Sequence, residues 1–326
     1  MHLILTKVRP SRPLSIFKVV IVHLFSHLCP IFHQSPPSLK TQTHFRDRGG
    51  ADVPAEGTKL PGQSVCVSGR SPRAVLRGCW GVTHGLRGGD ATSPCLQMRE
   101  VVAHLHGDGA VRVVVFRSLV PGVFCAGADL KERAKMTNSE AEHLVHGLRS
   151  LMTEIAVLPM PTVAAVDGFA LGGGLELALA CDLRTAASTA QMGLIEATRG
   201  LLPGAGGSQR LPRLVGFAVA KEMIFTGQRV TGERALQLGL VNRVAEQNEA
   251  GDAAYREALQ LARQILPQAP IALRMVKEAI SRGVEVDIDT GMAIEGMCYA
   301  KVIPTRDRQE GMAAFIEKRP PRYTGQ

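Results

Sequence analysis

The chain has 326 residues and 45% hydrophobic content, enough to build a packed core in one large domain or two. Its net charge is +9, but residues 1–95 contain twelve Lys and Arg against four Asp and Glu and so carry +8 of it. The rest of the chain is almost neutral. A nucleic-acid-binding protein would need the positive charge on its folded body, so this distribution argues against that class.

The basic end is predicted to be a leader. No acidic residue precedes Asp47, and the segment contains Ser and Thr, which is typical of a transit peptide and predicts a mitochondrial matrix protein. The apolar run 14–32 also fits the hydrophobic region of a secretory signal, and an unstructured leader is a third interpretation. Lys18, histidines and Pro30 interrupt that run, so we expect no membrane span.

The seven cysteines include no CxxC pair, and their odd number does not fit a complete disulfide framework. We therefore expect reduced, mostly buried thiols and no metal site.

Ordered structure is expected from about residue 96. A helical pattern over 96–106 leads to an apolar, β-branched strand at 111–116. A helical stripe over 138–157 ends at Pro159 and Pro161 and precedes a second strand at 162–166. A short helix to residue 180 and a strand at 183–186 continue the alternation. Such alternation predicts an α/β core of parallel strands with right-handed crossovers.

The last third of the chain is predicted to be helical. The expected helices cover residues 208–215, 218–225, 231–238, 252–266, 271–281, 288–300 and 306–318.

Two glutamates beside glycine-rich turns are the strongest chemical signal. Glu176 follows Gly172-Gly173-Gly174, and Glu196 lies upstream of the turn 203–207, Pro-Gly-Ala-Gly-Gly. Backbone N–H groups at a helix start are unpaired and favour negative charge. Carboxylates that move protons, next to fixed donors for a developing oxyanion, are the two parts that acid/base chemistry beside a carbonyl requires.

Residues 124–130, 167–182, 192–209 and 310–319 closely resemble the enoyl-CoA hydratase (crotonase) family. The resemblance covers about residue 98 to the end, and the segments 251–255 and 303–308 indicate a mitochondrial hydratase branch. It implies an α/β, crotonase-like ββα spiral core with a helical C-terminal region. The expected divisions are a leader at 1–95, the core at 96–265 and a helical region at 266–326 for oligomerisation and CoA contact.

The resemblance also implies roles for particular residues. The Ala128 and Gly173 amides would hold the thioester oxygen, Glu176 would take a proton from water attacking C3, and Glu196 would protonate C2. Gly204 would help to position the water. The implied activity is hydration of an enoyl-CoA in fatty-acid or branched-chain acyl-CoA metabolism, without a metal or redox cofactor, because coenzyme A belongs to the substrate.

Further residues are implied to bind CoA, partly across a subunit boundary of a homotrimer or hexamer. They are Ala126, Lys131, Phe315 and Lys318.

The N-terminal segment departs from the family pattern. Residues 1–95 lack the Asn-Arg-Pro and Asn-Ala signature, so the first ββα unit is expected to be missing or replaced, leaving a sheet edge open and removing part of the CoA-binding wall. The alternative function is therefore a catalytically impaired crotonase-like protein that binds acyl-CoA or a partner. An isomerase and an RNA-binding hydratase are lesser alternatives; the retained Glu176 and the neutral body argue against them.

Overall fold

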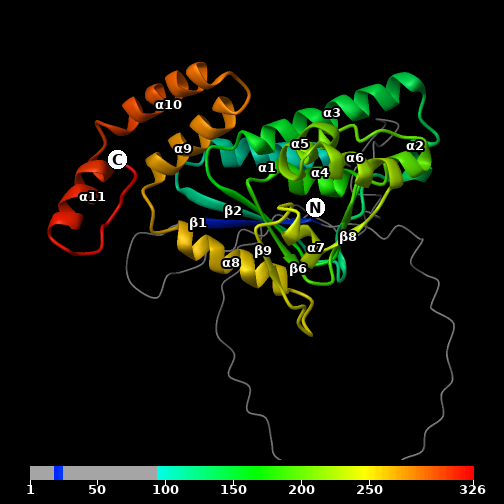
Figure 1. The fold of residues 1–326 in the computed structure, drawn as a ribbon, viewed down its shortest axis with the longest axis horizontal. Coiled ribbons are helices and arrows are strands. Elements are labelled where there is room, and N and C mark those ends of the chain that lie inside the picture. The colour runs from blue at the N-terminus through cyan, green and yellow to red at the C-terminus, as the bar shows by residue number, and fades with distance from the viewer. Residues whose placement is uncertain (1–17, 25–93) are drawn as a thin grey trace, which may run out of the picture.

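The computed structural model describes residues 18–24 and 94–326. Two sheets form its centre (Figure 1). The larger sheet has the order β1-β2-β4-β6-β9 and is parallel throughout. Its strands are β1 (Lys18–Leu24), β2 (Val111–Ser118), β4 (Thr162–Val166), β6 (Leu183–Ala187) and β9 (Arg243–Ala245).

The smaller sheet has the order β3-β5-β7-β8, with only β8 antiparallel to its neighbour. Its strands are β3 (Val123–Cys125), β5 (Phe169–Leu171), β7 (Gln191–Gly193) and β8 (Val230–Thr231). A strand of the large sheet, a strand of the small sheet and a helix follow one another repeatedly along the chain. This is the ββα spiral expected from the sequence.

Helices cover both faces of the large sheet. Val113 and Val115 of β2 pack with Ala258 and Ala262 on one face, where α8 (Ala253–Ile265) lies. Val114 and Phe116 belong to the main core on the other face, under the helices α1 (Pro94–Gly107) and α3 (Asn138–Ala156). Burial on both faces explains why β2 is continuously apolar over residues 113–116.

The helix α3 has the predicted amphipathic stripe. A capping box at Thr137 and Glu140 begins the helix by satisfying backbone N–H groups of its first turn. Its buried residues are Leu144, Leu148, Leu151, Met152 and Ile155, the positions expected from the period.

Strand β1 corrects the expectation that the edge of β2 is left open. It pairs in parallel along β2, and Val19, Val20 and Val22 are 2%, 3% and 0% exposed. The run that resembled a signal sequence contains it, because β-branched apolar residues also suit a buried strand. The other residues on which the leader prediction depends, 1–17 and 25–93, lie outside the described ranges.

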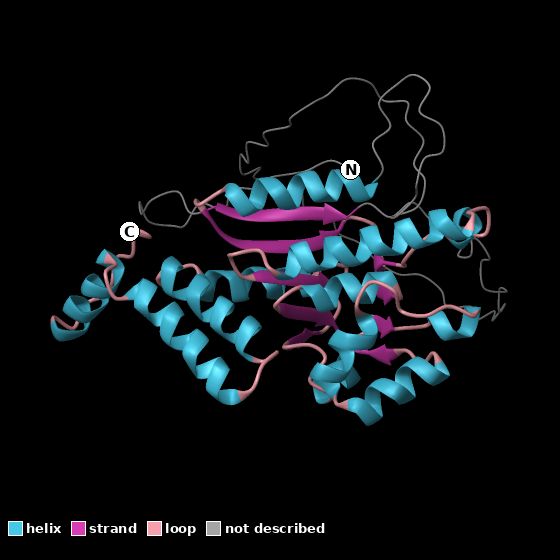
Figure 2. Ribbon diagram, turned by 90° about the horizontal axis from the view of Figure 1, so that it is seen from above, coloured by secondary structure: helices cyan, strands magenta, loops and turns pink. Residues whose placement is uncertain are grey.

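The predicted C-terminal helices are present, with shifts of a few residues at their ends. They are α5 (Gly207–Val215), α6 (Phe217–Thr226), α7 (Gly232–Gln237), α8, α9 (Pro270–Gly283), α10 (Ile288–Val302) and α11 (Arg306–Ile316). The last three extend to one side of the α/β core (Figure 2). Lys277 of α9 ties them to it by donating to Asp182 Oδ2 at 2.7 Å and to the Met160 carbonyl at 3.1 Å. No helix in the described ranges is long and apolar enough to cross a membrane.

The close packing of α4 (Gly173–Ala180) on β3 requires a glycine at position 174. A Cβ added at Gly174 would lie 1.9 Å from the Cys125 carbonyl oxygen, whereas one at Gly147, inside α3, would meet nothing within 4 Å. We predict that Gly174→Ala lowers the free energy of unfolding by about 1–3 kcal/mol or more, because the added methyl group would overlap backbone. Gly147→Ala should raise it by about 0.5–1 kcal/mol, because alanine loses less conformational entropy in a helix. Urea denaturation of both variants measures the difference, and equal stability of Gly174→Ala and wild type would contradict this packing.

Candidate active site

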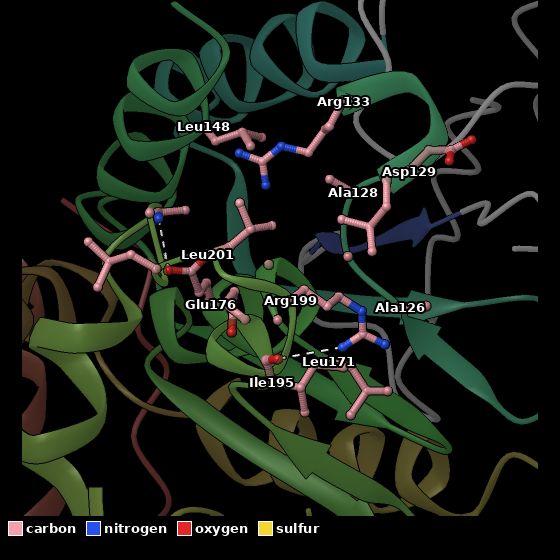
Figure 3. A pocket seen from close by; sticks show the side chains of 18 of the residues that line it. Ala126, Ala128, Asp129, Arg133, Leu148, Leu171, Glu176, Ile195, Arg199 and Leu201 are labelled. Atoms are coloured by element: carbon pink, nitrogen blue, oxygen red, sulfur yellow. Dashed lines mark hydrogen bonds between the residues drawn. The ribbon is translucent and has the colours of Figure 1, made fainter. Parts of the chain in front are cut away.

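A pocket of about 200 Å³ contains the two glutamates and both glycine-rich segments (Figure 3). Its walls come from the segment after β3, the start of α4, the 3₁₀ helix η2 (Glu196–Arg199), the turn before α5 and helix α3. Seven of the predicted site residues line it: Ala126, Ala128, Lys131, Gly173, Glu176, Glu196 and Gly204.

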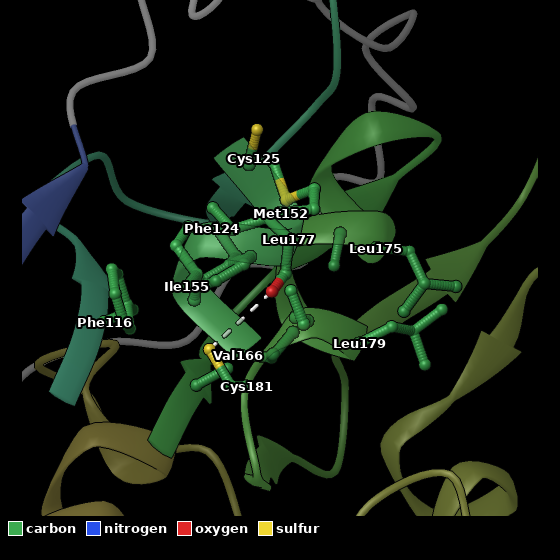
Figure 4. Packing of buried hydrophobic residues seen from close by; sticks show 14 of the residues in the cluster. Phe116, Phe124, Cys125, Met152, Ile155, Val166, Leu175, Leu177, Leu179 and Cys181 are labelled. Carbon is green, nitrogen blue, oxygen red and sulfur yellow. Dashed lines mark hydrogen bonds between the residues drawn. The ribbon is translucent and has the colours of Figure 1, made fainter. Parts of the chain in front are cut away.

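Helix α4 fixes the position of Glu176. The helix is apolar on nearly all sides, and residues 174–180 are all buried, so the core holds it from every direction (Figure 4). Leu175, Leu177 and Leu179 are at most 5% exposed. Glu176 is the one charged residue of this helix and is itself 3% exposed. A carboxylate here needs hydrogen-bonding partners, because burying an unpaired charge is costly.

Those partners are two backbone amides of the glycine-rich turn. Glu176 Oε1 accepts hydrogen bonds from the N–H groups of Ala205 and Gly207, each at 2.8 Å. A Cβ at Gly207 would lie 2.9 Å from Leu194 Cδ1 and 3.0 Å from both Glu176 Oε1 and Cγ, so glycine at this position lets the turn approach the carboxylate closely. The turn therefore orients one carboxylate oxygen and leaves the other for chemistry.

Glu196 is held differently, at the first position of η2. Its Oε2 is buried and has no hydrogen-bond partner among the described residues. A Cβ at Gly172 would lie 3.1 Å from Glu196 Oε1, and Gly172 has a φ of +54°. The glycine thus permits both the turn into α4 and the approach of this carboxyl.

The two carboxyls have unequal proton affinities. Burial raises the pKa of Glu196 to about 7, with a further contribution from the negative charge of Glu176. Burial also raises the pKa of Glu176, but the Gly207 and Ala205 amides oppose this by stabilising the ionised form, as does Arg210. The arrangement favours an ionised Glu176 beside a protonated Glu196.

The two predicted oxyanion donors lie on adjacent segments. Gly173 is the first residue of α4, where N–H groups have no partner within the helix. A Cβ at Gly127 would lie 3.5 Å from the Gly173 nitrogen, so the loop that carries Ala128 runs directly against this helix start. Two backbone segments can therefore present donors to one oxygen.

Phe315 and Lys318 are not part of this pocket within one chain. Phe315 is 86% exposed on α11 and lines a separate cavity of about 510 Å³ between the C-terminal helices. Lys318 follows α11. Their predicted contact with CoA across a subunit boundary remains a prediction.

Sequence reasoning missed the residues that orient Glu176. The turn 203–207 was expected to present amides, and Gly204 was predicted to help position the water, which stays a prediction; its carbonyl accepts from Arg149 Nε at 3.2 Å. The amides of Ala205 and Gly207 in the same turn bind Glu176, a contact that was not predicted. Arg133 and Arg199, which also line the pocket, were not predicted. Among the described residues, no group of three or more His, Cys, Asp or Glu could hold a metal ion.

The sequence profile of the enoyl-CoA hydratase/isomerase family matches residues 94–326. This is well over half of the chain.

The chain belongs to the enoyl-CoA hydratase/isomerase family. A bovine relative, enoyl-CoA hydratase domain-containing protein 2, mitochondrial, is 67% identical over 230 residues, covering 71% of this chain and 78% of the relative. Human mitochondrial methylglutaconyl-CoA hydratase is 57% identical over 229 residues, which cover 70% of this chain and 68% of the relative. These relatives confirm the branch that the sequence indicated.

Solved structures of the family confirm the crotonase-like fold. The crystal structure of enoyl-CoA hydratase from Bacillus anthracis has a TM-score of 0.68 and 44% identity, covering 72% of this chain and 89% of that one. The crystal structure of enoyl-CoA hydratase from Mycobacterium tuberculosis has a TM-score of 0.63 and 36% identity, covering 72% of this chain and 89% of that one.

The raised pKa of Glu196 predicts a pH-dependent stability difference. Between its ordinary value of 4.5 and about 7, the unfolded chain has released this proton while the folded chain keeps it. Stability due to this group therefore falls as pH rises through that interval. Glu196→Gln cannot titrate, so its melting temperature relative to wild type should rise from pH 4.5 to 7 and then level off. If the difference in melting temperature between Glu196→Gln and wild type does not change with pH, Glu196 titrates normally. The other buried carboxyls are present in both proteins, so their contributions to the pH dependence drop out of this difference.

Proposed function

We propose that this protein adds water across the C2=C3 bond of an enoyl-CoA thioester. The observation that carries the proposal is the pair of unequal carboxyls, Glu176 and Glu196, in one pocket beside two backbone donor segments. The relatives named as hydratases support the same reaction. A place in fatty-acid or branched-chain acyl-CoA breakdown follows from that substrate class.

In the proposed reaction, the N–H groups of Ala128 and Gly173 bind the thioester oxygen and stabilise the negative charge that develops there. Glu176, ionised and oriented by its two amide bonds, accepts a proton from the water that attacks C3. Glu196 donates its proton to C2. The product gains H at C2 and OH at C3, and passage of a proton from Glu176 back to Glu196 restores the starting state. The step is redox-neutral, so it requires no redox cofactor.

The two-glutamate arrangement also favours hydration over the alternatives. Shifting a double bond needs one group to move a proton, whereas adding water needs a base for water and an acid for carbon. An impaired, binding-only protein was suggested by the expected open sheet edge, and strand β1 pairs along that edge. We therefore give hydration as the function.

Assembly and location are part of the proposal. Lys131 lies at the pocket, whereas Phe315 and Lys318 lie on the C-terminal helical region, so a homotrimer or hexamer would let one subunit complete the CoA site of another. The names of the relatives support a mitochondrial protein.

Removing either carboxyl should abolish most of the activity. We expect Glu176→Gln and Glu196→Gln each to lower kcat for crotonyl-CoA by about 100- to 10,000-fold, because each loses one proton-transfer group. Loss of the conjugated thioester absorbance measures the rate. Glu222→Gln, a change at an exposed residue of α6, is the matched control and should behave as wild type. A near-normal rate in either pocket variant would exclude the proposed mechanism.

The pH profile should reveal the acid. Because Glu196 must be protonated and has a pKa of about 7, kcat/KM for crotonyl-CoA should fall as pH rises through that value. At low pH the rate should fall as well, when Glu176 becomes protonated. A rate that keeps rising from pH 7 to 9 would assign the acid to another group.

A further inference from the structure

The turn that holds Glu176 is itself held by an arginine. Arg210 lies near the start of α5, and its Nη1 donates a hydrogen bond to the Ala205 carbonyl at 3.1 Å. The N–H group of Ala205 donates in turn to Glu176 Oε1 at 2.8 Å. Arg210 lies outside the lining of the pocket, so its side chain reaches the carboxylate through the turn and not through the space that a substrate would occupy.

The guanidinium fits against the turn because residue 206 has no side chain. A Cβ at Gly206 would lie 2.2 Å from Arg210 Nη1, and the φ of Gly206 is +107°, a left-handed conformation that favours glycine. The Arg210 backbone N–H also donates to the Gly206 carbonyl at 2.9 Å. That carbonyl and the Gly207 N–H, the second donor to Glu176, belong to one peptide unit. Arg210 therefore contacts the turn at both places from which Glu176 is held.

The charge of Arg210 acts on the same carboxylate. Burial raises the pKa of Glu176, and the rise is opposed by the Gly207 and Ala205 amides, then by the charge of Arg210 and that of Arg133. The effect is mutual: burial lowers the pKa of Arg210, and the negative charge of Glu176 opposes this. Because the guanidinium is only partly in contact with water, its charge is screened less than that of an exposed side chain.

The charged groups around the two carboxyls are divided unevenly. Burial raises the pKa of Glu196, the negative charge of Glu176 adds to the rise, and the charges of Arg133 and Arg199 oppose it. Arg133, at the end of α2 (Leu130–Arg133), is thus among the main cations for both carboxyls. Arg199 of η2 is among those for Glu196, whereas Arg210 of α5 is among those for Glu176. Arg210 is the cation that favours the base over the acid.

We propose that Arg210 is a positioning residue for the base, because it holds the 203–207 turn against Glu176 and supplies a positive charge behind that turn. The inference rests on the proposed hydration, in which Glu176 accepts a proton from water. Arg210 contacts neither substrate nor water in this role. Without it, the two amide donors lose their support, and Glu176 binds its proton more tightly.

The pH profile of crotonyl-CoA hydration by the full chain tests this role. Arg210→Met should lower kcat at neutral pH by about 10- to 100-fold with little change in KM, because the base is misplaced. It should also move the low-pH fall in kcat/KM to higher pH, because Glu176 is protonated more readily. Arg210→Lys keeps the charge and should keep this fall near its wild-type position.

A second arginine of α5 provides the matched control. Arg213 is exposed on the same helix, and its Nη2 lies 3.3 Å from Glu285 Oε2 in a surface salt bridge. Such pairs contribute little to stability. Arg213→Met removes the same side chain and charge, and it should leave both kcat and the low-pH fall unchanged. Arg210→Gln, neutral but with an amide donor, replaces Arg210→Met if that variant does not fold.

Other results would overturn the proposal. If the neutral variant keeps the wild-type low-pH fall, or if Arg210→Lys moves it equally far, the charge of Arg210 does not act on the base, while hydration itself stands. If wild type does not hydrate crotonyl-CoA, the proposed function fails, and urea denaturation at pH 7 still tests the contact. The double variant of Arg210→Met and Glu176→Gln should then be more stable than the sum of the two single changes predicts; additive changes exclude the coupling.

Discussion

The hydrogen bonds from Ala205 and Gly207 to Glu176 connect the two halves of the site. Glu176 is attached to a helix that the core encloses, whereas the two amides belong to a turn that follows η2 and begins α5. Without these bonds a buried carboxylate would be costly, and the turn would lose a fixed point. The same contacts stabilise the ionised form of Glu176 and so oppose the rise in its pKa that burial causes; one interaction therefore contributes both to the shape of the pocket and to the charge of the proposed base.

The fold supplies the rigid frame that this interaction needs. Successive ββα units bring β3 and α4 together closely enough that Gly174 cannot carry a side chain. The loop with Ala128 then lies against the start of α4, so backbone segments from two units meet at the pocket. Strand β1 continues the large sheet on the outer side of β2, which explains how the sheet forms although the usual first-unit signature is absent from the sequence.

The surroundings of the two glutamates give chemically identical side chains different proton affinities. Both glutamates are shielded from water, but Glu176 has two amide donors and Glu196 has a buried oxygen without a described partner. The difference in hydrogen bonding, more than burial alone, is what would give them opposite roles as base and acid. Arg133 adds positive charge beside both groups, in a wall that is otherwise largely apolar.

The sequence by itself determined the parts that depend on local pattern. The apolar strand at β2, the stripe of α3, the glycine turn into α4 and the C-terminal helices follow from periodicity and turn residues, and Glu176 and Glu196 were found from the glycines beside them. The strands of the small sheet, only two or three residues long, were missed because so few residues have no measurable period. Only the tertiary structure decided that residues 18–24 form a strand, since an apolar β-branched run suits a signal sequence equally well. It also decided which amides bind Glu176 and that Arg133 faces the pocket, because contacts between residues far apart in sequence depend on how the packed units meet.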